Sequence, residues 1–156
     1  MKSKIKIANN LVKSESGIYE GTIVGIGFGE GKKVTKVGRD VEEIVYPRFE
    51  FVTEFEGTGE SIRIKTYTGT SINSEPVEVL YSGRGKSNEV NVYNRFTTLL
   101  MKLGMLTEND LASVTAEVVE KIEKDVLELK GQMIKCKIGK DKNGYFAVDF
   151  GTLEMK

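Results

Sequence analysis

The 156-residue sequence contains no histidine, no tryptophan, one cysteine (Cys136) and two prolines. Without histidine the chain lacks the commonest general base and the commonest zinc ligand, so a histidine-based catalytic triad and a zinc finger are excluded. A single cysteine allows no internal disulfide, which is typical of proteins in reducing compartments. Little proline and a hydrophobic content of 39% argue against a disordered chain.

The chain also has no excess of charge and no long apolar run. Its 23 Lys and Arg residues balance 23 Asp and Glu residues, so attraction to a polyanion requires an uneven placement of charge. No segment reaches the roughly 20 apolar residues that span a bilayer. The charged residues 1–7 are not followed by the apolar run of a secretory signal. We therefore expect a cytoplasmic protein without a membrane partner.

The length suits one compact domain and is too short for two ordinary ones. Residues 1–16 are polar and indicate a loose leader, so we expect a single domain over residues 17–156. Its 17 glycines suggest many turns between short strands.

Alternation of apolar and polar residues predicts strands at 18–28, 44–55, 61–68, 132–139 and 145–150. In the second of these, Phe49, Phe51 and Phe55 share one face, which we expect to be buried. Glycines at positions 21, 25 and 27 predict a bent or bulged first strand. Residues 29–42, rich in glycine and charge, are predicted to form a loop. Asn143 and Gly144 are expected to supply the positive φ angles of a closing turn at 141–144.

From Asn88 the apolar period changes from 2 to about 3.6, which predicts a helix that ends at Gly104. A second helix is predicted from the N-cap Thr107 to about Lys124. Residues 76–81 are expected to add a short strand, and residues 82–87 a flexible loop. The first helix buries a stripe formed by Val92, Phe96, Leu99, Leu100 and Leu103.

This order of elements predicts a mainly β fold. Three strands, helices and two further strands match a five-stranded antiparallel Greek-key barrel with helices between strands 3 and 4, the OB-fold. The helices are confined to one connection, which argues against a doubly wound parallel sheet. An α+β sandwich is the alternative, because residues 76–81 add a strand that the barrel does not require.

The outward face of the predicted second and third strands combines aromatic and basic residues. Tyrosine rings stack on bases and basic side chains contact phosphates, and this strand face is where OB-folds bind oligonucleotides. Glu50 and Glu54 share the face, so the alternative is a solvated surface on which opposite charges pair across strands. The candidate binding residues here are Tyr46, Arg48, Arg63, Lys65 and Tyr67.

Two further groups extend this candidate site. Residues 29–39 hold four basic residues and one acidic residue, a local charge of +3, and we interpret them as a basic loop that closes over a single strand. Its basic members are Lys32, Lys33, Lys36 and Arg39. Lys135 and Lys137 alternate outward on the predicted strand 132–139, and Tyr145 follows the turn at 141–144.

No catalytic residue, metal ion or cofactor is expected. Residues 82–87 match only the end of a phosphate-binding loop, because the first glycine of that motif falls on Leu80. Asp40, Glu42 and Glu43 are weighed as ligands of a metal-dependent nuclease, but a solvated charged run is the preferred interpretation.

Five segments carry a resemblance to a known family: residues 17–22, 47–51, 93–104, 129–131 and 144–146. In these segments the chain resembles the small OB-fold single-stranded-DNA-binding proteins of phage replication modules. The resemblance implies sequence-independent binding of single strands in DNA replication or recombination, without catalysis and as an oligomer. It also implies the host cytoplasm as the location, and replication proteins and a second copy of the chain as candidate partners.

Single-stranded DNA binding is thus the leading hypothesis, with preference between DNA and RNA left open. The alternative is a structural or adaptor module of a virion or replication complex that binds another protein through its helices.

Overall fold

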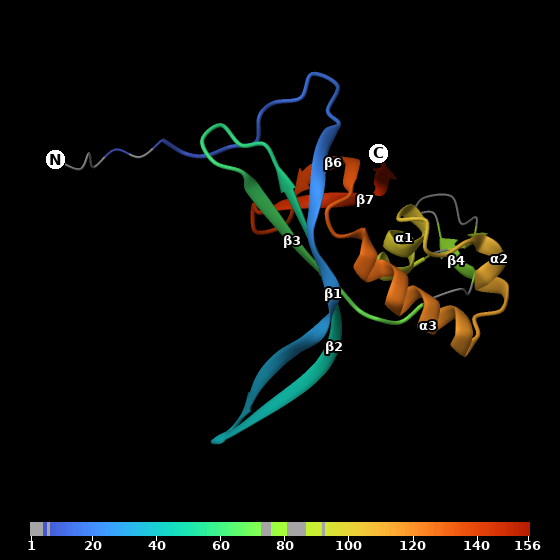
Figure 1. Cartoon of the computed structure of the whole chain (residues 1–156). Coiled ribbons are helices and arrows are strands. Elements are labelled where there is room, and N and C mark those ends of the chain that lie inside the picture. Colours follow the sequence, from blue (N-terminus) through green and yellow to red (C-terminus); the bar gives the residue numbers. More distant parts are fainter. Residues whose placement is uncertain (1–4, 6, 73–75, 81–86, 92) are drawn as a thin grey trace.

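The computed structural model describes residues 5, 7–72, 76–80, 87–91 and 93–156 and is built mainly from β-strands. A five-stranded antiparallel sheet forms its centre, with a separate two-stranded hairpin and short helices beside it (Figure 1). The strands are β1 (Tyr19–Val37), β2 (Asp40–Phe55), β3 (Ile62–Thr68), β4 (Pro76–Leu80), β5 (Ser87–Asn91), β6 (Met133–Lys140) and β7 (Phe146–Met155).

The helices all lie between β3 and β6, which are the third and fourth strands of the main sheet. The prediction that the helices interrupt the strands at this point is confirmed. The helical elements are α1 (Arg95–Lys102), α2 (Glu108–Ala112), α3 (Ala116–Asp125) and the 3-10 turn η1 (Val126–Leu129).

The main sheet has the strand order β3-β2-β1-β6-β7, and every neighbouring pair is antiparallel. Some Cα atoms of the edge strands β3 and β7 lie within 8 Å of each other. In the described part of the chain, however, no hydrogen-bonded ladder joins these two edges. The five-stranded antiparallel sheet is therefore confirmed, whereas its predicted closure into a barrel is not.

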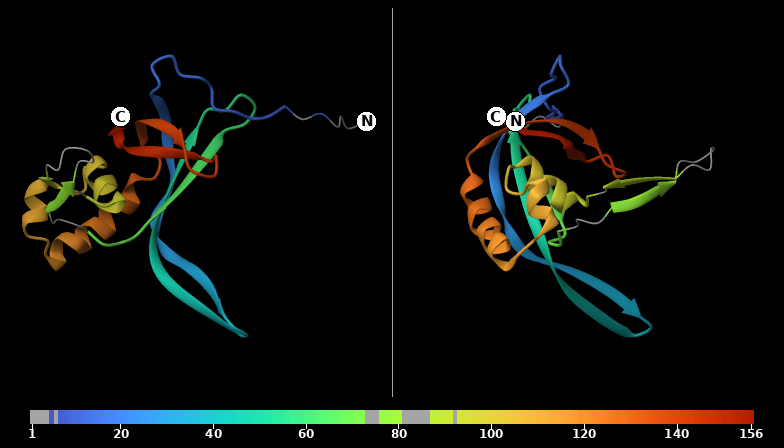
Figure 2. Two further views of the ribbon diagram at one scale, coloured as in Figure 1. Left: turned by 180° about the vertical axis from the view of Figure 1, so that it is seen from behind. Right: turned by 90° about the vertical axis from the view of Figure 1, so that its right-hand side faces the viewer.

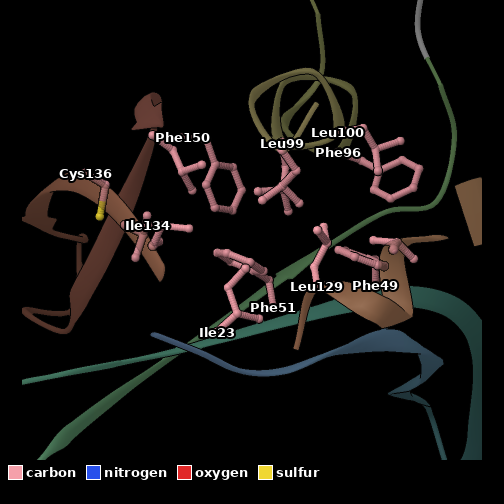
Figure 3. Packing of buried hydrophobic residues seen from close by; sticks show 14 of the residues in the cluster. Ile23, Phe49, Phe51, Phe96, Leu99, Leu100, Leu129, Ile134, Cys136 and Phe150 are labelled. Carbon is pink, nitrogen blue, oxygen red and sulfur yellow. The ribbon is translucent and has the colours of Figure 1, made fainter. Parts of the chain in front are cut away.

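One face of the sheet carries the hydrophobic core. Phe49 and Phe51 on β2 are fully buried, and Figure 3 shows this layer facing the side chains of α1, among them Phe96 and Leu99. The prediction that Phe49 and Phe51 share a buried face with Phe55 is confirmed. Burying each such side chain stabilises the fold by about 1.5–3 kcal/mol.

The glycine-rich first strand contains the predicted bulge. The register of β1 against β2 shifts between Ile23 and Gly25, so the face that points at the core changes there. Ile23 is buried before the bulge, and Ile26 packs against the core after it.

The predicted loop at residues 29–42 is wrong, because β1 and β2 form one continuous hairpin through it. The ladder runs out to Val37 opposite Asp40, and Gly38 closes the turn with a φ of +64°, which glycine adopts at no steric cost. Lysines and glycines suggested a loop, but both are tolerated at exposed strand positions where a paired neighbour satisfies the backbone. The basic residues at 32, 33, 36 and 39 therefore belong to a β-hairpin and its turn.

We call residues 30–47 the arm. Within the described residues, β3 pairs with β2 only from Phe49 onward and β6 pairs with β1 only up to Thr22. No other strand thus covers either edge of the arm. Figures 1 and 2 show the arm as a twisted ribbon that extends away from the rest of the molecule.

The helix predicted from Asn88 begins later than expected, at Arg95. The Asn94 side chain caps α1 by accepting a hydrogen bond from the Thr97 amide at 2.8 Å. Residues 87–91 instead form β5, which pairs with β4, so the predicted extra strand is confirmed over Pro76–Leu80. Tyr81, residues 82–86 of the predicted loop and Val92 lie outside the described residues.

The end of α1 and the start of α2 are as predicted. Gly104 has a φ of +78° just after α1, and Thr107 caps α2 in a capping box with Asp110. The single helix predicted up to Lys124 is wrong, because Thr115 accepts a hydrogen bond from the Val118 amide and starts α3 as a new helix.

The last two strands form the predicted hairpin, although β7 continues to Met155. Asp141 Oδ1 accepts hydrogen bonds from the amides of Asn143 and Tyr145, which fixes the turn. Gly144 has a φ of +81°, whereas Asn143 does not have the positive φ that was predicted for it.

Residues 9–12, within the expected leader, are attached to the turn between β2 and β3. Asn9 Oδ1 accepts a hydrogen bond from the Gly59 amide at 2.8 Å, and the Val12 amide donates to the Glu56 carbonyl at 3.1 Å. Leu11 also forms a bridge with Gly57.

Candidate nucleic-acid interface

The predicted binding face lies on the side of the β2–β3 hairpin that points away from the core. The register places Tyr67 opposite Glu50, Lys65 opposite Val52 and Arg63 opposite Glu54. Arg63, Lys65 and Tyr67 are exposed and alternate with buried residues of β3, so this part of the strand pattern is as predicted.

Arg48 and Tyr67 are in contact on this face. The Arg48 guanidinium carbon lies 4.0 Å from the centre of the Tyr67 ring, which is a cation–π contact. The two residues are diagonal neighbours across the strands, because Arg48 lies two positions before Glu50, the register partner of Tyr67. The result is a stacked pair of flat groups at the solvent-facing surface.

Tyr46 lies two positions before Arg48, on the same face of β2. Its ring lies across Gly31 of β1, where an added Cβ would collide with the ring. The glycine thus lets the ring lie flat against the backbone of the neighbouring strand. Tyr46 and Tyr67 are 43% and 39% exposed, so both rings remain accessible to a ligand.

These side chains line an open hollow of about 340 Å³ between the base of the arm and the start of α1. We call it the tyrosine groove and define it by Tyr46, Arg48, Tyr67 and Arg95. Arg95 was not among the predicted binding residues, because the helix was expected to start at Asn88 and Arg95 therefore fell in its interior.

Asn94 fixes the position of Arg95. While its Oδ1 caps α1, its Nδ2 donates a hydrogen bond to the Ser71 carbonyl at 2.8 Å. These bonds tie the start of α1 to the chain that follows β3. The Arg95 guanidinium lies 5.1 Å from the centre of the Phe150 ring, a second cation–π contact.

Arg63 does not line the groove and is paired with Glu54. Its Nε donates a hydrogen bond to Glu54 Oε2 at 2.9 Å, which is the charge pairing that the alternative interpretation expected. Lys65 lies on the same face as Tyr67 and two residues before it, without lining the groove.

The basic residues of the arm do not form one patch. Lys32 and Lys36 alternate with Lys33 along β1, so Lys33 lies on the opposite face. Lys32 Nζ lies 3.2 Å from Glu43 Oε1. The arm contains four basic residues and four acidic ones (Glu30, Asp40, Glu42 and Glu43), so its formal charge is zero.

The local charge of +3 counted over residues 29–39 is therefore cancelled by the strand that pairs with them. Because Asp40 and Glu42 lie on the face opposite Glu43, the three candidate carboxylates also do not converge. Among the described residues there is no group of three or more metal-ligating side chains.

The candidates on β6 lie among acidic residues. Lys135 is opposite Glu20 on one side and Glu154 on the other, and Lys137 is opposite Asp149. Glu20 also forms an ion pair with Lys156 at 2.8 Å, and this hydrogen bond lowers the pKa of the Glu20 carboxyl. Tyr145 is 70% exposed and, like both lysines, does not line the tyrosine groove.

Of the twelve residues that the sequence nominated, the structure thus brings three together in the groove: Tyr46, Arg48 and Tyr67. The comparisons with protein-family models, curated proteins and solved structures found no match for this chain. In the described part of the chain, no helix has the length and apolar character needed to cross a membrane.

Proposed function

We propose that this protein binds single-stranded DNA through the tyrosine groove, without catalysis and largely independently of base sequence. The observation that carries the proposal is one open hollow lined by Tyr46, Arg48, Tyr67 and Arg95, in which the Arg48 guanidinium lies over the accessible Tyr67 ring. Every base has a flat face, so stacking on tyrosine tolerates any sequence.

The groove offers both kinds of contact that a single strand needs. Tyr46 and Tyr67 would each stack on a base and contribute about 1–3 kcal/mol. Arg48 and Arg95 would contact phosphates, and Arg48 can also stack because its guanidinium group is flat. Lys65 would extend the cationic path along β3.

The strand order supports an OB-like architecture as part of this proposal. The order β3-β2-β1-β6-β7, with the helices before β6, is the one expected of an OB-fold. In that fold the face of the second and third strands binds oligonucleotides. The proposed role in phage DNA replication or recombination, in the host cytoplasm, rests on the sequence resemblance alone.

The proposal predicts that Tyr67→Ala weakens binding to a fluorescently labelled oligo-dT by about 1–3 kcal/mol, because one stacking contact is lost. Tyr145→Ala is the matched control: it also removes a tyrosine, but one that lies outside the groove. Fluorescence anisotropy titration of both variants and the wild type measures the difference. Equal affinities for the three proteins would exclude Tyr67 from the site.

The same titration separates the other classes of function. Duplex DNA is expected to bind more weakly than oligo-dT, because paired bases cannot stack on the rings. The salt dependence is expected to be shallow, because few phosphates are contacted. Shortening of the labelled strand in the presence of magnesium would contradict a non-enzymatic role.

A further inference from the structure

Both strands of the arm carry exposed apolar side chains. An isolated two-stranded hairpin is only marginally stable, and a stable one usually packs a hydrophobic face on something. In the described part of the chain no strand pairs with the edges of the arm, yet it carries a series of β-branched apolar side chains. This contrast raises the question of what covers them.

Three of these side chains form one patch, which we call the valine face. The register places Glu43 opposite Val34, so Val41 and Val45 are its two diagonal neighbours on the same face of the ribbon. Val34, Val41 and Val45 are 61%, 62% and 51% exposed. The same face continues to Phe28, which contacts the core through Phe49.

The other face of the arm has no comparable patch. Ile44 lies opposite Lys33, and its diagonal neighbours on β1 are Gly31 and Thr35. Val37 lies opposite Asp40, beside the turn. Ile44 is followed on the same face by Tyr46 of the groove, two residues along β2, so within the arm apolar residues of the two strands are neighbours on the valine face alone.

Charge on the valine face is divided between the two strands. Lys32 and Lys36 lie on β1, whereas Glu43 lies on β2, and Glu30 is the exception near the base of the arm. Suppose that a second arm faces the first across a two-fold axis that runs parallel to both ribbons. Strand β1 of the second arm, with its lysines, then lies above β2 of the first arm, with Glu43. The charges of two valine faces are therefore complementary to each other.

We propose that the valine faces of two copies of this chain pack against each other and form a two-fold symmetric dimer. A two-fold axis joins the same patch of both subunits, as self-complementarity requires. The zero net charge of the arm supports a second copy rather than a nucleic acid as occupant, because nucleic-acid binding depends on neutralising phosphates. This proposal does not depend on DNA binding.

Sedimentation equilibrium of the full chain without nucleic acid tests the proposal. The wild type is expected to be a concentration-dependent dimer. The double variant Val34→Thr with Val45→Thr should weaken dimerisation at least about tenfold, because it keeps β-branched side chains and removes apolar contact. A control with Val37→Thr and Ile44→Thr changes similarly exposed residues of the opposite face and should dimerise like the wild type.

A wild type that stays monomeric at every concentration would overturn the proposal, as would equal effects of the two double variants. Circular dichroism of each variant shows whether it is folded. Charge reversal gives a second, independent readout: Lys32→Glu with Glu43→Lys keeps the ion pair and should dimerise with itself. It should pair poorly with the wild type, because like charges would then meet. Free mixing of the two would contradict the proposed packing.

Discussion

Glycines opposite aromatic rings determine how two side chains of β2 lie. Gly31 faces Tyr46, and Gly21 faces Phe55, and at both positions an added Cβ would collide with the ring. The two rings differ in how freely they can move, because Phe55 is buried in the core whereas Tyr46 is partly exposed at the groove. The same pairing therefore supports packing at one site and shapes a ligand surface at the other.

We expect Gly31→Ala to leave the fold stable and to weaken oligo-dT binding, because the Tyr46 ring must swing away from β1. Gly21→Ala is the comparison: the Phe55 ring cannot move freely in the core, so overpacking should cost about 1–3 kcal/mol of unfolding free energy. Urea denaturation and anisotropy titration separate the two effects. Unchanged DNA affinity in Gly31→Ala would show that the position of the Tyr46 ring does not matter for binding.

Cys136 is the one thiol of the chain, and its burial raises its pKa to about 12, with Asp149 adding to the shift. The native state therefore favours the protonated thiol, while the unfolded thiol ionises near its ordinary pKa of about 8.5. Stability from this group is complete below about pH 8.5 and falls as the pH rises toward 12.

We accordingly expect a thiol reagent such as DTNB to label the native protein slowly at pH 8 and rapidly in urea. Comparing the pH dependence of unfolding in the wild type and in Cys136→Ala isolates this group. A wild-type curve parallel to that of the variant above about pH 8.5 would contradict the assigned shift.

At the scale of elements, patterns of period two were reliable where one face is buried. Phe49, Phe51 and Phe55 predicted β2 correctly, because alternating burial leaves a clear trace in the sequence. Residues 29–42 gave no such trace, since neither face of the hairpin is buried in the core there and the lysines and glycines resembled a loop. The assignment of these residues to a loop was therefore the largest error of the prediction.

The groove residues that lie on strands could be predicted from the sequence, whereas the one on α1 could not. Tyr46, Arg48 and Tyr67 follow from strand alternation and hairpin register, which the sequence indicates. The place of Arg95 depends on where α1 begins, directly after its N-cap Asn94, and Asn94 is also bonded to the Ser71 carbonyl, 23 residues earlier in the chain. A tertiary hydrogen bond of this kind leaves no periodic signal.

Asn94 should therefore matter for both stability and binding. We expect Asn94→Ala to lower the free energy of unfolding by about 0.5–2 kcal/mol, the usual cost of losing an N-cap. It should also weaken oligo-dT binding, because Arg95 is no longer held beside the tyrosines. Thr115→Ala, which removes the cap of α3 away from the groove, is the matched control and should affect stability alone. Equal DNA affinities of both variants would contradict this role of Asn94.

At the scale of the whole molecule, a formal charge of zero conceals an uneven distribution. Residues 107–130 carry seven acidic and three basic residues, whereas the groove contains Arg48 and Arg95. A polyanion would therefore be directed toward the groove and away from α2 and α3. The arm, with its charges balanced, projects from this body and is available to a second copy (Figure 2).

The absence of tryptophan allows one direct test of the groove. In a Tyr67→Trp variant the new indole is the only tryptophan fluorophore, and we expect oligo-dT to quench its emission as a base stacks on it. The same substitution at Tyr145 provides the reference and should show no quenching at the same DNA concentrations. Equal quenching at both positions, or none at Tyr67→Trp while the DNA is bound, would contradict the account.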